Sequence, residues 1–177
     1  SRPMPAAPPE IETLTLDRLA TPIGTALLVT DAAGYLRAFN WTDYEAHMLA
    51  WIGKHYPKAR LREGRAPAGV RGPFEAYFKG DAGALDAVRW KASGTPFQLK
   101  VWETLCSIPP GETLSYRGLA ERIGRPTAVR AVGLANGANP VAVVVPCHRV
   151  IGINGSLTGY GGGLPRKEWL LAHEGAS

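Results

Sequence analysis

The sequence predicts a mixed α+β protein with an N-terminal α/β domain and a mostly helical C-terminal domain. Before residue 41, strand-length segments alternate with turn-forming residues. After residue 93, two helix starts carry N-terminal capping residues, and apolar residues follow them at helical spacing. With 177 residues, the chain is long enough to bury a sizeable apolar core.

The composition divides the chain into three segments. Residues 1–10 carry four prolines and are expected to form a flexible tail. Residues 11–90 contain no cluster of catalytic residue types and are expected to form an α/β support domain. Residues 91–177 contain the chemically informative motifs and are expected to form a domain that carries the functional site.

The support domain is expected to combine a short antiparallel sheet with helices in a three-layer-like arrangement. Period-2 patterns and flanking turn residues predict strands at 14–19, 24–30 and 34–40. Asp43 is a suitable N-cap for a helix that runs to about Lys54. The rest of this half predicts a loop over 57–73, a short helix over 74–78 and an extended segment over 85–90.

The C-terminal half opens with a strong helix start at Thr95-Pro96-Phe97-Gln98. Thr95 and Gln98 form a capping-box pattern, and Pro96 suits the first helical position. The helix is expected to end before Pro109. Cys106 lies near this end, and we expect it to be buried and inert, since free cysteine usually packs as a small hydrophobe.

Two short helices are expected next, and together they have the form of a helix-turn-helix. Ser115 caps the first helix and Gly124 ends it, while the second runs over about 127–136. A plain helical hairpin has the same pattern. The second helix is rich in small residues, which suit either close packing or close approach to a nucleic-acid backbone, with Arg130 projecting from it.

The most informative segment runs from Asn139 to Val150. The β-branched run 141–145 predicts a buried strand that ends at Pro146, so Cys147 follows at the end of that strand. A buried structural cysteine is the common alternative. The neighbouring His148 and Arg149 are side chains that lower a thiol pKa, and a glycine-rich loop at 159–163 leaves room for a pocket, so a reactive cysteine is favoured.

Charge and composition exclude several classes of protein. The net charge is +5, and residues 91–177 hold most of the excess, with 9 Lys/Arg against 5 Asp/Glu. This balance is compatible with a polyanionic partner. The longest aliphatic run is five residues, so no membrane span is expected. Two cysteines cannot build a disulfide scaffold or a cysteine-based zinc site.

These motifs, in this order, resemble the O6-alkylguanine-DNA alkyltransferases, or methylated-DNA–protein-cysteine methyltransferases. The resemblance covers about residues 93–175 and is specific, while the N-terminal half matches only in outline. It rests on segments 95–98, 115–116, 130–133, 139–140, 146–150 (Pro-Cys-His-Arg-Val), 159–160 and 166–175. It implies that residues 91–177 form a DNA-binding and active-site domain that contains a helix-turn-helix.

The resemblance implies a suicide repair reaction on O6-alkylguanine, and O4-alkylthymine as a further substrate is left open. The Cys147 thiolate would displace the alkyl group from guanine O6 in duplex DNA and keep it as a thioether. His148, oriented by Glu174, would take the thiol proton through a bound water. Asn139 would tie the second helix to the active-site strand. No cofactor and no metal are expected.

The resemblance also implies how DNA is bound. Because the reactive atom lies inside the duplex, the damaged nucleotide must be flipped out. Arg130 would fill the vacated stack, and the helix would enter the minor groove. The residues expected at the DNA are Ser115, Tyr116, Arg130, Ala131 and Gly133. The residues expected to line the base pocket are Tyr116, Val150, Tyr160 and Gly161.

Three other functions are weighed against this one. A non-catalytic alkyltransferase-like lesion-binding protein would replace the cysteine, which is present as Cys147. A regulator of adaptive-response type would need a Cys-rich metal domain. A Cys-His hydrolase would turn over repeatedly without DNA. We expect a monomer that acts on alkylated double-stranded DNA in the cytoplasm, or in the nucleus of a eukaryote, with no membrane contact and with cooperative assembly on DNA left open.

Overall fold

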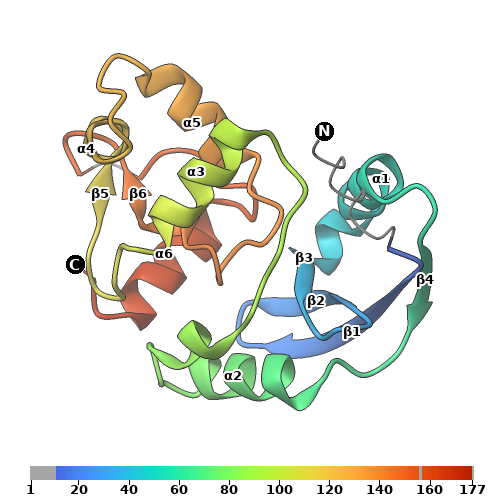
Figure 1. Ribbon diagram of the computed structural model, residues 1–177. Coiled ribbons are helices and arrows are strands. Elements are labelled where there is room, and N and C mark those ends of the chain that lie inside the picture. The colour runs from blue at the N-terminus through green and yellow to red at the C-terminus, as the bar shows by residue number, and fades with distance from the viewer. Residues whose placement is uncertain (1–10, 156, 177) are drawn as a thin grey trace, which may run out of the picture.

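The computed structural model describes residues 11–155 and 157–176, and it has the mixed α+β architecture that the sequence predicts (Figure 1). The N-terminal half contains β1 (Thr13–Thr21), β2 (Gly24–Asp31), β3 (Leu36–Trp41), α1 (Glu45–His55), β4 (Arg60–Glu63) and α2 (Ala68–Phe78). The C-terminal half contains α3 (Pro96–Leu105), β5 (Leu114–Ser115), α4 (Tyr116–Arg122), α5 (Val129–Gly137), β6 (Val150–Ile151) and α6 (Leu164–His173). The expected tail at 1–10 lies outside the described residues.

The N-terminal sheet has the strand order β3-β2-β1-β4, and helices cover it on two sides (Figure 1). The three predicted strands are antiparallel, as expected. Alternate residues of β2 face opposite sides: Leu27 packs with Met48 and Ile52 of α1, whereas Leu28 packs in the cluster that contains Phe74 of α2. This alternation produces the layered arrangement that the sequence predicts.

Several predictions for the N-terminal half are wrong. The expected loop over 57–73 contains β4, which pairs parallel to β1, and the first part of α2. β4 has no alternating apolar pattern in the sequence, because it is an edge strand whose side chains are mostly exposed and polar. A short 3₁₀ turn, Ala84–Ala87, replaces part of the expected extended segment. Asp43 does not cap α1 but lies in the 3₁₀ turn Thr42–Tyr44 that precedes it.

The helix starts of the C-terminal half match their predictions closely. Thr95 and Gln98 form both hydrogen bonds of the capping box at α3. The Ser115 hydroxyl accepts a hydrogen bond from the Gly118 amide at the start of α4. Gly124 adopts a left-handed backbone (φ +78°) after α4, as its position predicts. Cys106 is exposed, so the expectation that it is buried is wrong.

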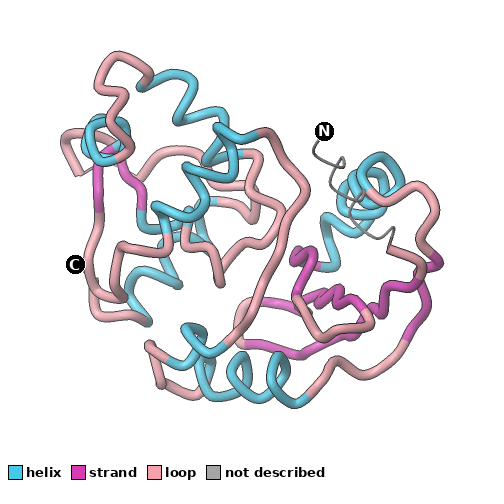
Figure 2. Tube along the Cα trace, in the orientation of Figure 1, coloured by secondary structure: helices cyan, strands magenta, loops and turns pink. Residues whose placement is uncertain are grey.

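The β-branched run 141–145 does not form the predicted strand. The Val145 amide donates to the Val141 carbonyl at 3.0 Å, so the chain folds into a tight turn, and Val143 has a left-handed backbone (φ +74°). In the described part of the chain its β-pairing consists of isolated bridges, Phe39 with Val141 and Ala142 with Val145. Figure 2 shows it as loop. Val141, Val143 and Val145 are buried, and this burial explains the β-branched composition of the segment without a sheet.

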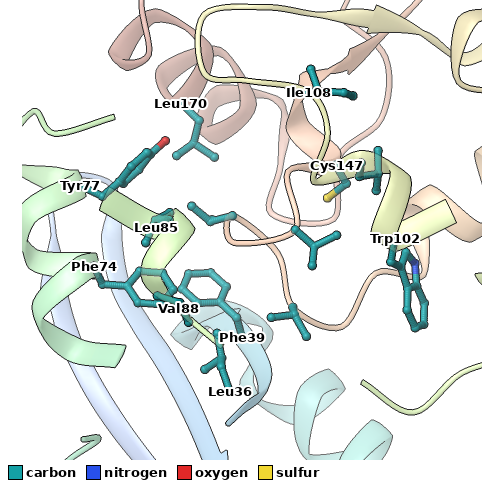
Figure 3. Close-up of a cluster of buried hydrophobic side chains, with 14 of the residues drawn as sticks. Leu36, Phe39, Phe74, Tyr77, Leu85, Val88, Trp102, Ile108, Cys147 and Leu170 are labelled. Carbon is teal, nitrogen blue, oxygen red and sulfur yellow. The ribbon is translucent and has the colours of Figure 1, made fainter. Parts of the chain in front are cut away.

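One apolar cluster joins the two halves of the chain. Phe39 of the sheet stacks on Phe74 of α2 (ring centroids 5.4 Å apart), and the same cluster continues to Trp102, Cys147 and Leu170 (Figure 3). The predicted boundary at residue 90 therefore crosses a continuous core. Within the described residues, no helix has the length and apolar character needed to span a bilayer.

We predict that Phe74→Ala lowers the free energy of unfolding by about 3–5 kcal/mol, because the ring is fully buried and the replacement leaves a cavity. Chemical denaturation monitored by tryptophan fluorescence measures this change. Leu49→Ala is the matched control, because Leu49 is 39% exposed and its loss is expected to change stability by no more than about 0.5 kcal/mol. Equal losses in the two variants would contradict the proposed central position of Phe74.

Candidate active site

The loop that follows α5 leads directly into the 3₁₀ turn Cys147–Arg149, and Cys147 is the first residue of that turn. Asn139 holds this loop from inside: its Oδ1 accepts from the Val141 amide at 2.9 Å, and its Nδ2 donates to the Val145 carbonyl at 2.8 Å. Pro146 precedes Cys147 directly. Cys147 begins the 3₁₀ turn and is 7% exposed. A rigid, side-chain-braced turn therefore takes the place of the expected strand end.

The Cys147 side chain borders a cavity of about 340 Å³ that both halves of the chain build. Trp41 and Tyr44 line it from the N-terminal half, and Asn136 lines it from α5. The glycine-rich loop also lines it, with Tyr160 and Gly161 among the lining residues. The volume lies in the range of small-molecule sites, so the thiol is buried but not sealed inside the core.

A buried carboxylate, Glu174 at the end of α6, organises the polar groups beside Cys147. Its oxygens accept hydrogen bonds from the Tyr77 hydroxyl (2.6 Å), His148 Nε2 (2.8 Å) and Arg149 Nε and Nη2 (2.8 and 3.0 Å). The Glu174 side chain is fully buried. Burial raises the pKa of Glu174, but the hydrogen bonds from His148 and Arg149 outweigh this effect and hold the pKa at about 2.

His148 is held as a neutral ring with one nitrogen free for proton transfer. Burial lowers the pKa of His148, although its hydrogen bond with Glu174 works in the opposite direction. An ionised carboxylate can only accept, so Nε2 carries the proton and Nδ1 is the basic nitrogen. Nδ1 is buried and has no hydrogen-bond partner among the described residues. The ring can therefore take up a proton at Nδ1 while Glu174 stabilises the resulting charge.

The Cys147 thiol is under opposing influences. Burial raises its pKa, whereas a hydrogen bond with the Asn139 side chain and the positive charge of Lys167 lower it. Arg149 does not act on the thiol as its position in the sequence suggested, because its guanidinium points to Glu174 and to the Ile108 carbonyl. The side chains that favour the thiolate are thus not the sequence neighbours of Cys147: Asn139 lies in the preceding turn and Lys167 in α6.

The residues expected at the DNA lie together on α4 and α5. Arg130 and Ala131 are exposed on α5, and Gly133 faces the Tyr116 ring, which would contact a Cβ at 3.7 Å. Ser115 is used as the cap of α4. The Tyr116 hydroxyl accepts a hydrogen bond from Thr158 Oγ1 at 3.0 Å.

Only two of the four residues expected in the base pocket line the cavity beside Cys147. Tyr160 and Gly161 line the cavity beside Cys147, whereas Tyr116 and Val150 do not. The Val150 carbonyl instead accepts a hydrogen bond from Lys167 Nζ at 2.6 Å. In the described part of the chain, no group of three or more His, Cys, Asp or Glu side chains is placed to hold a metal ion.

Two residues of this site have no signal in the sequence. Tyr77 belongs to α2 of the N-terminal half, and its hydroxyl reaches Glu174 across 97 positions of the chain. Lys167 lies in the first turn of α6, where a lysine normally points to solvent, yet it is fully buried. Only the three-dimensional structure brings Tyr77 to Glu174 and Lys167 to the backbone carbonyls of Val150 and Thr158.

Comparison with known proteins gives a consistent result. Residues 96–176 match the family model described as "6-O-methylguanine DNA methyltransferase, DNA binding domain". A protein of Shigella flexneri named methylated-DNA–protein-cysteine methyltransferase is 47% identical over 161 residues, which cover 90% of this chain and 94% of the relative. The chain belongs to the methylated-DNA–protein-cysteine methyltransferase family. The predicted family resemblance is confirmed, and it extends through the N-terminal half.

Solved structures of this methyltransferase family share the fold. The crystal structure of the Mycobacterium tuberculosis O6-methylguanine methyltransferase is 38% identical, with a TM-score of 0.72 over 92% of this chain and 93% of that one. The M. tuberculosis protein OGT in complex with DNA, also 38% identical, gives a TM-score of 0.75 over 91% and 92% of the two chains.

The charge of Glu174 predicts how acid affects the methyltransferase fold. Because its pKa of about 2 lies below the ordinary value of 4.5, ionised Glu174 stabilises the folded protein above pH 4.5, and this contribution is lost as the pH falls towards 2. Glu174→Gln is expected to be less stable at neutral pH, since Arg149 loses its buried partner, and to lose less stability in acid. Urea unfolding at several pH values measures both effects.

Glu103→Gln, which removes an exposed carboxylate, is the control and is expected to follow the wild-type pH dependence. A Glu174→Gln variant with the same acid sensitivity as the wild type would contradict an ionised, buried Glu174.

Proposed function

We propose that the protein repairs O6-alkylguanine in duplex DNA by transferring the alkyl group irreversibly to Cys147. The observation that carries this proposal is the buried thiol beside an open cavity, next to a neutral His148 whose free Nδ1 can accept a proton. The family and the DNA complex of a similar protein support DNA as the partner. The protein is expected to act on DNA as a monomer. It is expected to do so in the cytoplasm, or in the nucleus of a eukaryote.

In the proposed reaction, the Cys147 proton passes towards His148 Nδ1, through the water that the family resemblance implies. The thiolate sulfur then attacks the alkyl carbon. A carbon–sulfur bond forms while the bond between carbon and O6 breaks, and the proton ends on the guanine that leaves. Glu174 stabilises the transient imidazolium charge through its 2.8 Å contact with Nε2. The thioether consumes the nucleophile, so each chain reacts once.

We further propose that α4 and α5 act as a helix-turn-helix that flips the damaged nucleotide. Arg130 is exposed on α5 and would fill the vacated stack, and the small residues of α5 suit close approach to the minor groove. Tyr116 lies between α5 and the loop that carries Thr158, so it can guide the nucleotide. Asn139 positions Cys147, because it braces the turn before it.

Alkyl transfer predicts a covalent product that intact-protein mass spectrometry can detect. After incubation with duplex DNA that contains O6-methylguanine, the chain is expected to gain the mass of one methyl group on Cys147. Cys147→Ala is expected to gain none, and Cys106→Ser, which removes the other thiol, is expected to react like the wild type. Repeated turnover without a mass change would favour a Cys-His hydrolase, and lesion binding without transfer would favour an alkyltransferase-like protein.

The role of Arg130 predicts a difference between substrates. Arg130→Ala is expected to slow repair in duplex DNA by about tenfold or more. The inserted arginine offsets part of the free energy that is lost when the base leaves the stack, and alanine does not. Reaction with a free O6-alkylguanine base, which needs no flipping, is expected to change little. Arg62→Ala, an exposed β4 residue, controls for the change in net charge. Equal slowing on both substrates would remove Arg130 from the flipping step.

A further inference from the structure

Thr158 holds the hydroxyl group of Tyr116, and the proposed reaction gives this threonine no part. Among the described residues, the Tyr116 hydroxyl has one hydrogen-bond partner: Thr158 Oγ1 donates to it at 3.0 Å, across 42 positions of the chain. Both residues are half-buried, so the two hydroxyl groups lie at the edge of the protein and not in its core. A bound DNA strand can therefore contact this pair.

The position of Thr158 is fixed from the interior by a buried lysine. Lys167 is fully buried, and its Nζ donates to the Thr158 carbonyl at 3.2 Å and to the Val150 carbonyl at 2.6 Å. Val150 begins β6, which pairs with β5, and Tyr116 follows β5 directly (Figure 1). Lys167 thus ties Thr158 to the same pair of strands that leads into Tyr116, and the two hydroxyl groups share one support.

The Tyr116 ring is held at a second place by α5. A Cβ at Gly133 would lie 3.7 Å from the ring, which is an ordinary van der Waals distance. The ring therefore lies against the helix that is proposed to enter the minor groove, while Thr158 holds its far end. Two contacts from different segments together fix the direction in which the hydroxyl points.

The direction of the hydrogen bond suits a hydroxyl that binds a phosphate. A phenolic oxygen can accept one hydrogen bond while its own O–H group donates another. Because Thr158 is the donor, the Tyr116 proton stays available, and in the described part of the chain it has no acceptor. A phosphate oxygen of DNA can only accept. The bond from Thr158 also polarises the Tyr116 O–H group, since hydrogen bonds in a chain strengthen one another.

We propose that Thr158 is a positioning residue for nucleotide flipping, which holds the Tyr116 hydroxyl so that it donates to a phosphate of the damaged strand. The inference rests on the proposed function, in which Tyr116 guides the flipped nucleotide. It adds a residue outside the helix-turn-helix to the part of the protein that handles DNA, and it gives the buried Lys167 a supporting role. Thr158 takes no part in the chemical step at Cys147.

The test compares repair of duplex DNA with reaction of a free base. Thr158→Val removes the hydroxyl and keeps a β-branched side chain of similar volume. We expect this variant to slow methyl transfer from O6-methylguanine in duplex DNA by about threefold to tenfold, the effect of one lost hydrogen bond between neutral groups. Reaction with the free O6-methylguanine base needs no flipping and is expected to keep its rate. Thr158→Ser, which retains the hydroxyl, is expected to repair duplex DNA nearly as fast as the wild type.

A double-mutant cycle shows whether Thr158 acts through Tyr116. Tyr116→Phe alone is expected to slow duplex repair at least as much as Thr158→Val does. In the Tyr116→Phe background, Thr158→Val is expected to cause no further loss, because the partner hydroxyl is already absent. The same loss in both backgrounds would overturn the inference, and so would equal slowing of Thr158→Val on duplex DNA and on the free base.

Thr104→Val is the matched control, because it also removes the hydroxyl of a half-buried threonine, which donates to the Lys100 carbonyl at 2.7 Å. It is expected to react with both substrates like the wild type. Failure of the proposed function would appear separately, as a wild-type chain that gains no methyl group on Cys147. If the wild type gains the methyl group and Thr158→Val repairs duplex DNA at the same rate, the positioning role alone is wrong.

Discussion

The Glu174 carboxylate connects three parts of the chain that the active centre needs. It accepts hydrogen bonds from Tyr77 of α2, from His148 and Arg149 of the 3₁₀ turn, and it lies itself at the end of α6. A fully buried carboxylate is stable only with such a complete set of donors, because each unpaired oxygen would lose its hydration without compensation. The N-terminal half therefore contributes to the active centre, because its Tyr77 hydroxyl completes the set of donors to Glu174, and Glu174 in turn orients His148. Orientation of His148 depends on both halves folding together.

Burial has opposite consequences for the groups on this network and for the thiol. For Glu174, surrounding donors outweigh burial and the charge is retained. For Cys147, burial dominates and favours the neutral thiol, although Asn139 and Lys167 act against it. The pKa of the buried Cys147 thiol is thus raised, and the neutral thiol is the favoured form in the resting site. The buried environment also strengthens the attraction between opposite charges, so few groups of the right sign are enough to shift the balance between thiol and thiolate.

The sequence predicts the fold class, the first three strands, the capped starts of α3 and α4, and the reactive cysteine. These features depend on local chemistry: capping side chains, turn residues and alternating burial act within a few positions. The turn at Val141–Val145 gives a strand-like pattern in the sequence, because burial of Val141, Val143 and Val145 favours the same β-branched residues in a turn as in a strand. β4 was missed because an exposed edge strand carries polar side chains. Tyr77 and Lys167 could not be found from the sequence, since their roles arise from contacts across the fold, and a lysine shows no sign of its burial in one sequence.

Most of the buried side-chain polar atoms that lack a hydrogen-bond partner among the described residues lie around Cys147, whereas those of Tyr56 and Arg71 lie elsewhere. The Asn136 Oδ1 and the His148 Nδ1 are both buried and make no hydrogen bond with any described residue. Asn136 lines the cavity beside Cys147, and His148 is the next residue along the chain from that thiol. Unpaired buried acceptors lower the stability of the folded state, and natural proteins hold few of them. Their position beside Cys147 marks this side of the cavity as the place where hydrogen-bond donors of a bound molecule would find acceptors.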